Sequence, residues 1–174
     1  MSGDVTVRVV RPEDVETLHA NCLSGWTLEQ VRAEIGHNLE ALEQGLRVHL
    51  VAIADGMVVG TAYLNRHTHR LRRHRAEFEG IVVYPLYQRR GIARRLMEEA
   101  CRRAAAMGVT ILETSTRGGT AAEEVFHRLG FFEYGRLPDG FVDNGRVFDH
   151  VLLYMPIGGD GGKGQCRGMV SGRS

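Results

Sequence analysis

Residues 81–94 read Ile-Val-Val-Tyr-Pro-Leu-Tyr-Gln-Arg-Arg-Gly-Ile-Ala-Arg and mark the junction between a strand and a helix. The strand ends here because Pro85 cannot donate a hydrogen bond to a neighbouring strand. A helix then begins at Gly91, where the first backbone N–H groups lack helical partners and the helix dipole favours an anion. Gly91 has no Cβ to block a phosphate, and the flanking arginines add attraction. The junction therefore predicts a diphosphate site.

Two common phosphate-binding loops are excluded at this junction. A P-loop requires Gly-x-x-x-x-Gly-Lys-Ser/Thr, and a dinucleotide fingerprint requires three glycines after the strand. Residues 81–94 have neither pattern. The alternative is an ordinary helix start with solvated arginines, and the residues of the junction alone leave both interpretations open.

Hydrophobic periodicity along the chain predicts eleven strands and helices, including the strand and the helix that meet at the junction. Strands are expected over residues 5–9, 47–54, 57–65, 77–83, 109–116, 131–137 and 146–155, and helices over 12–23, 28–42, 91–107 and 121–129. Asp55-Gly56 and Asp143-Asn144-Gly145 are typical of hairpin turns. The order β-α-α-β-β-β-α-β-α-β-β combines hairpins with helical crossovers, so the fold class is α/β (α+β) with a mixed sheet.

Composition limits the classes of protein to be considered. The chain has 174 residues, 43% of them apolar, and a net charge of +1, which fits one domain and argues against a protein that coats nucleic acid. No apolar run reaches the ~18 residues of a membrane span, and the N-terminus lacks a signal-peptide core. The three scattered cysteines indicate no disulfide framework, so we expect a cytoplasmic protein. Residues 4–157 should form the domain, and the Gly-rich residues 158–174 a disordered tail.

Two motifs resemble the GNAT acetyltransferases. Gln88-x-x-Gly91-x-Ala93, after a strand that ends Val82-Val83-x-Pro85, is similar to motif A of that family, although an alanine replaces its commoner third-position glycine. Ala121-x-x-x-x-Phe126-x-x-x-Gly130-Phe131 resembles the fourth-helix motif of the family. The similarity extends over about residues 4–157. The runs Arg75-Ala76-Glu77 and Arg136-Leu137-Pro138 are, in addition, similar to the tabtoxin-resistance type of GNAT.

The resemblance implies a fold and a co-substrate. The expected fold is a GNAT-like, mixed but mostly antiparallel central sheet flanked by helices on both faces. The expected co-substrate is acetyl-CoA. Its pantetheine arm would pair with the backbone of Ile81, Val82 and Val83, as an added strand pairs with an open sheet edge. The residues expected around its pyrophosphate are Gln88, Arg89, Arg90, Gly91, Ile92, Ala93 and Arg94.

Glu77 and Glu79 are the candidate catalytic residues. They lie two apart on one expected strand, so they point to the same face, and each charge raises the pKa of the other. A raised pKa suits a base that deprotonates an amine. Glu77 also occupies the position where many GNATs carry the base. The alternative for both is a solvated or salt-bridged residue on the sheet face.

Phe126 departs from the pattern of the family, which often places a proton-donating tyrosine at this position. A thiolate with a pKa of about 8.5 is a moderately good leaving group, so an acid could be dispensable. Water, Tyr87 or Tyr134 could otherwise supply the proton. The sequence leaves the general acid open.

The resemblance predicts an N-acetyltransferase that acts on a primary amine of a small molecule, such as a metabolite, an amino-acid-like compound, an antibiotic or a toxin. Direct attack in a ternary complex is expected because no cysteine has the setting of a nucleophile. The alternatives are a non-catalytic acyl-CoA sensor, an acetyltransferase for protein or peptide amines, and a nucleic-acid-binding module using the basic residues 66–75. That loop has no stacking aromatics and no complete zinc ligand set, so nucleic acid and metal are not expected. A homodimer is one assembly to consider, and the acceptor amine cannot be named.

Overall fold

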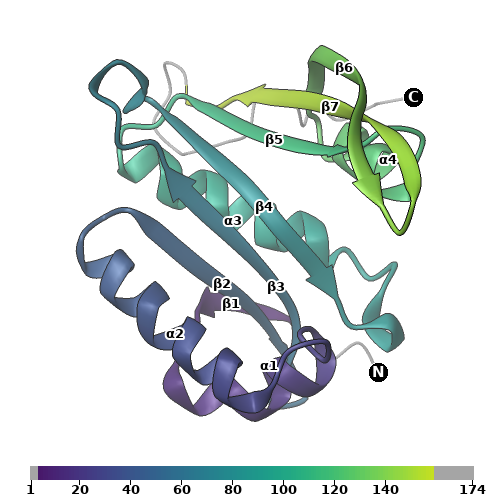
Figure 1. The fold of residues 1–174 in the computed structure, drawn as a ribbon. Helices are drawn as coiled ribbons and strands as arrows, with labels where there is room; N and C mark the ends of the chain where they lie inside the picture. Colours follow the sequence, from purple (N-terminus) through teal and green to yellow (C-terminus); the bar gives the residue numbers. More distant parts are fainter. Residues whose placement is uncertain (1–3, 159–174) are drawn as a thin grey trace, which may run out of the picture.

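Residues 4–158, the part of the chain described by the computed structural model, form one seven-stranded sheet with four α-helices (Figure 1). The strands are β1 (Thr6–Val9), β2 (Arg47–Ala54), β3 (Met57–Arg66), β4 (Arg75–Val83), β5 (Ile111–Arg117), β6 (Phe132–Asp143) and β7 (Arg146–Pro156). The helices are α1 (Val15–Asn21), α2 (Leu28–Glu43), α3 (Ile92–Ala106) and α4 (Ala121–Arg128). Short 3₁₀ turns cover Pro12–Asp14, Arg70–Arg72 and Pro85–Tyr87.

The strand order is β1-β2-β3-β4-β5-β7-β6. Within residues 4–158, β4 and β5 form the one parallel pair, and every other neighbouring pair is antiparallel. Parallel strands need a long crossover, which α3 supplies between β4 and β5. The predicted mixed, mostly antiparallel sheet and the predicted order of elements are confirmed.

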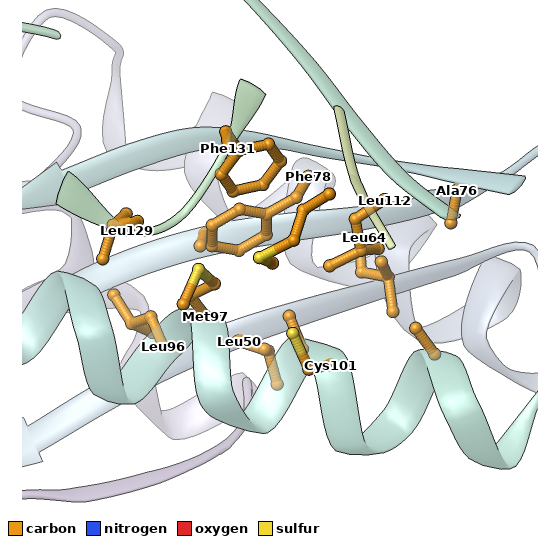
Figure 2. Close-up of a cluster of buried hydrophobic side chains, with 14 of the residues drawn as sticks. Leu50, Leu64, Ala76, Phe78, Leu96, Met97, Cys101, Leu112, Leu129 and Phe131 are labelled. Carbon is orange, nitrogen blue, oxygen red and sulfur yellow. The ribbon is translucent and has the colours of Figure 1, made fainter. Parts of the chain in front are cut away.

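The helices cover both faces of the sheet, as predicted. On one face, α1 and α2 pack over β2 and β3 through a small core that includes Leu18, Val31 and Ile35. On the other face, α3 buries its apolar side in the main core (Figure 2). Residues of this core that Figure 2 labels are Leu50, Leu64, Ala76, Phe78, Leu96, Met97, Cys101, Leu112, Leu129 and Phe131. The alternation of strand residues between these two cores fixes which side chains are left for a site.

Several predicted boundaries were wrong. The helix expected over residues 12–23 is a 3₁₀ turn followed by the seven-residue α1. The strand expected to end at residue 137 continues through Pro138 to Asp143, with an irregular register between Leu137 and Phe141. Proline is tolerated there because β6 is the edge strand, where a missing N–H costs no pairing.

Apart from Gly158, the tail expected over residues 158–174 lies outside the described residues. Among the residues described, no helix combines the length and apolar character needed to span a membrane.

Candidate active site

A cleft opens in the sheet where β4 and β5 diverge. The two strands pair only from Arg75–Glu77 to Ile111–Glu113, although both continue beyond that point. A cavity of about 710 Å³ fills the gap. Its walls are Glu79, Gly80, Ile81, Val83, Gln88, Arg89, Gly91, Ile92, Ala93, Arg94, Thr114, Ser115, Ala121, Ala122, Val125, Phe126, Arg128 and Leu129. The cavity thus joins the end of β4, the start of α3 and the side of α4.

Gly80 shapes the edge of β4 that lines this cleft. The register with β3 shifts here, so that Gly80 and Ile81 together lie opposite Ala62. Gly80 has a φ of +63°, and a Cβ on it would lie 2.6 Å from the ring of Tyr63. Only glycine fits this bulge, which bends a strand locally. The role of Gly80 was not predicted from the sequence, although a glycine inside a strand pattern is a known signal for a bulge.

The start of α3 has the properties of an anion site. Gly91 caps the helix with a φ of +74°, and a Cβ placed on it would meet no described atom within 4 Å. Arg89 also has a positive φ of +62°, which is unusual for a residue with a side chain. Gln88 Nε2 donates to the carbonyl oxygen of Val83, 3.2 Å away, and so ties the loop to the end of β4. The first N–H groups of α3 therefore face the cavity beside Arg89 and Arg94.

The cavity brings together most of the residues expected at the cofactor. Eight of the ten line it: Ile81, Val83, Gln88, Arg89, Gly91, Ile92, Ala93 and Arg94. The other two of these ten residues, Val82 and Arg90, do not line the cavity. Arg90 instead lies over the ring of Tyr87, 4.8 Å from its centroid.

We call the open face the side of β4, β5, β7 and β6 that α1 and α2 leave uncovered (Figure 1). Glu77 and Glu79 on β4 share it with Glu113 and Ser115 on β5, because alternate residues of a strand point to one side. The cavity reaches this face at Glu79 and Ser115 and reaches the α3 core at Ile92, Phe126 and Leu129. It therefore connects the two faces of the sheet.

Glu79 and Glu113 are both held by basic or amide groups. Asn65 Nδ2 donates to Glu79, and Arg47 lies 3.7 Å from the same carboxylate oxygen. Glu113 is only 8% exposed, and Arg75 donates to both of its oxygens.

Further contacts surround Glu113. His67 Nε2 and the Tyr134 hydroxyl lie 3.0 Å and 3.3 Å from its carboxylate oxygens. Burial opposes ionisation of Glu113, but the bonds from Arg75 and His67 hold its pKa below the ordinary value. The place of Glu113 in the site was not predicted from the sequence, because its partners lie on elements distant in the chain.

Glu77 is different from both of its neighbours. Its carboxylate makes no hydrogen bond or ion pair with another residue of the described range 4–158. Burial is the main cause that raises its pKa, and the charge of Glu79 raises the pKa further. Of the two carboxylates predicted to be catalytic, Glu77 is thus the one whose oxygens are free to take a proton.

A partly buried chain of polar side chains lies beside the carboxylates, on β2, β3 and α2. Arg47 donates to Asn38 of α2 and, through Nε, to Asn65 of β3. Asn38 also contacts His49, whose other ring nitrogen lies 2.8 Å from the Thr61 hydroxyl. Burial lowers the pKa of His49 to about 3, so the ring is neutral near pH 7. These contacts join α2 to β2 and β3 beside the site.

In the wall of the cavity near α4, Phe126 occupies the position where a proton-donating tyrosine was considered. Phe126 is 7% exposed and packs edge-on against Phe131. Beside it in the wall, Thr114 is 3% exposed, and its hydroxyl finds no hydrogen-bond partner within residues 4–158. The Tyr87 hydroxyl donates to Asp55, 2.6 Å away, outside the cavity. Tyr134 reaches the carboxylates instead, through its bond to Glu113.

Comparison with known proteins supports one family. The model of the acetyltransferase (GNAT) family matches residues 13–131. No protein with a curated description matches the sequence.

Solved structures share the fold. A GNAT-family acetyltransferase from Streptococcus pneumoniae is 22% identical, with a TM-score of 0.73 over 89% of this chain and 100% of that one. The structure of yncA from Salmonella typhimurium with its cofactor acetyl-CoA is 20% identical, with a TM-score of 0.72 over 87% and 93%. A ribosomal-protein-alanine N-acetyltransferase from Brucella melitensis is 24% identical, with a TM-score of 0.73 over 86% and 98%.

Proposed function

The chain belongs to the GNAT family of acetyltransferases, and from this premise we propose that it acetylates a primary amine of a small molecule. As a member of that family it is an enzyme that uses acetyl-CoA, which sets aside the non-catalytic sensor. The observation that carries the proposal is the continuity of the cavity from the start of α3 to Glu79 on the open face, one strand repeat from Glu77. Such a passage lets a cofactor enter from one side and an amine from the other.

The cofactor half of the proposal uses two backbone features. The β5 side of β4 is unpaired beyond Glu77, so the amides of pantetheine can add to it as a strand along Ile81 and Val83. The pyrophosphate then meets the N–H groups at Gly91 and the guanidinium groups of Arg89 and Arg94. Val82 and Arg90 are proposed only as neighbours of this site, since neither lines the cavity.

The chemical half of the proposal assigns the base to Glu77. An ammonium acceptor gives a proton to the Glu77 carboxylate, and the neutral amine attacks the thioester carbon. The C–N bond forms and the C–S bond breaks, and the second proton of the nitrogen passes through water to the departing thiolate of CoA. Glu77 is favoured over Glu79 because its oxygens are free and its pKa is raised towards neutrality.

Measurement of free thiol from acetyl-CoA in the presence of amines tests this function. Wild-type protein should release thiol in an amine-dependent way, and Glu77→Gln should lower kcat by about 10²–10⁴-fold with little effect on KM for acetyl-CoA. Glu124→Gln is the control, since that carboxylate is exposed on α4. If Glu79→Gln lowers kcat and Glu77→Gln does not, the base is Glu79, two residues along β4, and not Glu77.

Acetylation of a protein or peptide amine is the second candidate. It is favoured by the similarity to the ribosomal-protein-alanine N-acetyltransferase from Brucella melitensis, which shares only the fold at 24% identity. A short peptide with a free N-terminus in the same thiol assay distinguishes the candidates. The narrower similarity to the tabtoxin-resistance type rests on Arg75–Glu77 and Arg136–Pro138 and stays a sequence-based prediction, as do the cytoplasmic location and the homodimer.

A further inference from the structure

A row of side chains runs across the sheet from β2 and β3 onto the open face, and its chemical character changes halfway. In register from β2 to β6, the cross-strand partners are Arg47, Asn65, Glu77, Glu113, Tyr154 and Phe132. Residues directly opposite each other on neighbouring strands point to the same face. The row is therefore polar and charged as far as Glu113 and aromatic beyond it.

The aromatic half of the row is a connected surface. Tyr154 lies 6.0 Å from Phe132 and 5.8 Å from Tyr134 between ring centroids. Phe132 is 55% exposed and Tyr134 is 52% exposed, so the rings are open to a ligand. Three strand spacings of about 4.8 Å separate Glu77 from Phe132, so a molecule of about 14 Å could touch both. The Tyr134 hydroxyl joins this surface to the carboxylates through Glu113.

One carboxylate on the open face is free to pair with a cation of the acceptor. Arg47 and Asn65 engage Glu79, and Arg75 and His67 engage Glu113. Glu77 is the remaining carboxylate of β4 and β5 on this face, and it has no partner within residues 4–158. A second ammonium at the far end of the acceptor would lie against the aromatic rings with no free carboxylate of β4 or β5 to pair with. Burial of an unpaired charge is costly, so a polyamine fits poorly.

We propose that the acceptor is a monoamine attached to an aromatic or extended apolar body. Its amine lies at Glu77, and its body lies across Tyr134, Tyr154 and Phe132. This substrate class rests on the proposed function, because it places the reacting amine at the mouth of the cavity beside Glu79 and Ser115. The rings of the acceptor and of the protein then pack together with the usual preference of aromatic pairs.

Two amines of equal chain length isolate the effect of the second charge. Hexylamine and 1,6-diaminohexane differ at one end only, and 2-phenylethylamine adds the aromatic body. We expect kcat/KM for hexylamine and for 2-phenylethylamine to exceed that for the diamine by about ten-fold or more. A preference for the diamine, or for the α-amine of a tripeptide, overturns the proposal.

Variants test whether the aromatic surface holds the body of the acceptor. Phe132→Gln should raise KM for 2-phenylethylamine about ten-fold and leave KM for acetyl-CoA unchanged. Val147→Gln is the matched control: Val147 is 53% exposed in the same hairpin, but it alternates with the β7 residues of the open face and points away from them. Equal effects of the two changes overturn the proposal.

Failure of the inference differs from failure of the proposed function. If no amine releases thiol, the proposed function fails. Calorimetry with the CoA-saturated protein then still compares 2-phenylethylamine with 1,6-diaminohexane on the open face. Tighter binding of 2-phenylethylamine supports the inference, and equal or weaker binding overturns it.

Discussion

Glu77 and Glu113 lie directly opposite each other on β4 and β5, in the last pair before the two strands separate. Arg75 forms an ion pair with Glu113 and His67 lies within hydrogen-bond distance of it, whereas Glu77 has no such partner among residues 4–158. The pKa of Glu113 is accordingly lowered and that of Glu77 raised, by burial first and by nearby carboxylates second. The two carboxylates at one point of the sheet thus differ in their partners and in the direction of their pKa shifts, which suits the proton transfer proposed for Glu77 and a structural role for Glu113.

The charge of Glu79 should control the pH dependence of the reaction. A base must be ionised, so the rate should rise with pH through the raised pKa of Glu77. Glu79→Gln removes one cause of that elevation. We expect the acidic limb of the profile of kcat/KM against pH to move to lower pH while the enzyme stays active.

The exposed Glu124→Gln change is the control for this experiment, and its profile should coincide with that of the wild-type protein. A limb that stays in place in Glu79→Gln would mean that the group observed in the profile is not Glu77.

Gly91 should be required for cofactor binding. At a concentration of 100 times Kd, CoA should stabilise the protein by about 2.7 kcal/mol, or raise Tm by roughly 5–10 °C. Gly91→Glu places a side chain and a negative charge where the pyrophosphate would lie, so it should abolish this rise.

Gly45→Glu is the matched control for Gly91→Glu. Gly45 has a similar φ of +66°, and a Cβ on it likewise meets no described atom within 4 Å. It lies outside the walls of the cleft. Both changes carry the same backbone penalty, so an equal response of the two variants to CoA would place the cofactor elsewhere.

The sequence predicted the parts of the site that depend on local order. The strand end at Pro85, the helix start at Gly91 and the shared face of Glu77 and Glu79 all follow from spacing along one segment. The free state of Glu77 could not be predicted, because it depends on which carboxylate Arg75 contacts across the sheet. The length of β6 was missed for a similar reason, since its pairing with β7 overrides the local effect of Pro138.

Gly80 should be needed for the shape of the cleft as well as for stability. Gly80→Ala forces a Cβ against Tyr63 at a positive φ, so we expect a loss of about 2 kcal/mol or more and a Tm lower by roughly 4–8 °C. At temperatures where the variant stays folded, KM for acetyl-CoA should rise, because the open edge of β4 shifts.

Gly36→Ala provides the contrast with Gly80→Ala. Gly36 lies in α2, and a Cβ on it meets no described atom within 4 Å. This change should stabilise the protein by about 0.5–1 kcal/mol. A harmless Gly80→Ala would show that the bulge is not fixed by this glycine.

His49 should make the protein sensitive to acid. Burial, with a further contribution from Arg47, lowers its folded-state pKa to about 3, whereas an unfolded histidine has a pKa of about 6.5. Above pH 6.5 both states are neutral at this residue, and its full contribution to stability is present. As the pH falls from about 6.5 towards about 3, the unfolded state takes up a proton that the native state does not. The free energy of unfolding should then fall by at most about 1.4 kcal/mol per pH unit on account of this group.

His49→Gln removes the titration but disturbs the bonds to Asn38 and Thr61. The Tm of this variant should therefore be lower than that of the wild-type protein at pH 7.5, and it should decrease less between pH 7.5 and pH 5. The exposed His37→Gln is the control, and it should keep the wild-type dependence; a His49→Gln protein that loses stability as steeply as the wild type would show that His49 takes up its proton in the native state.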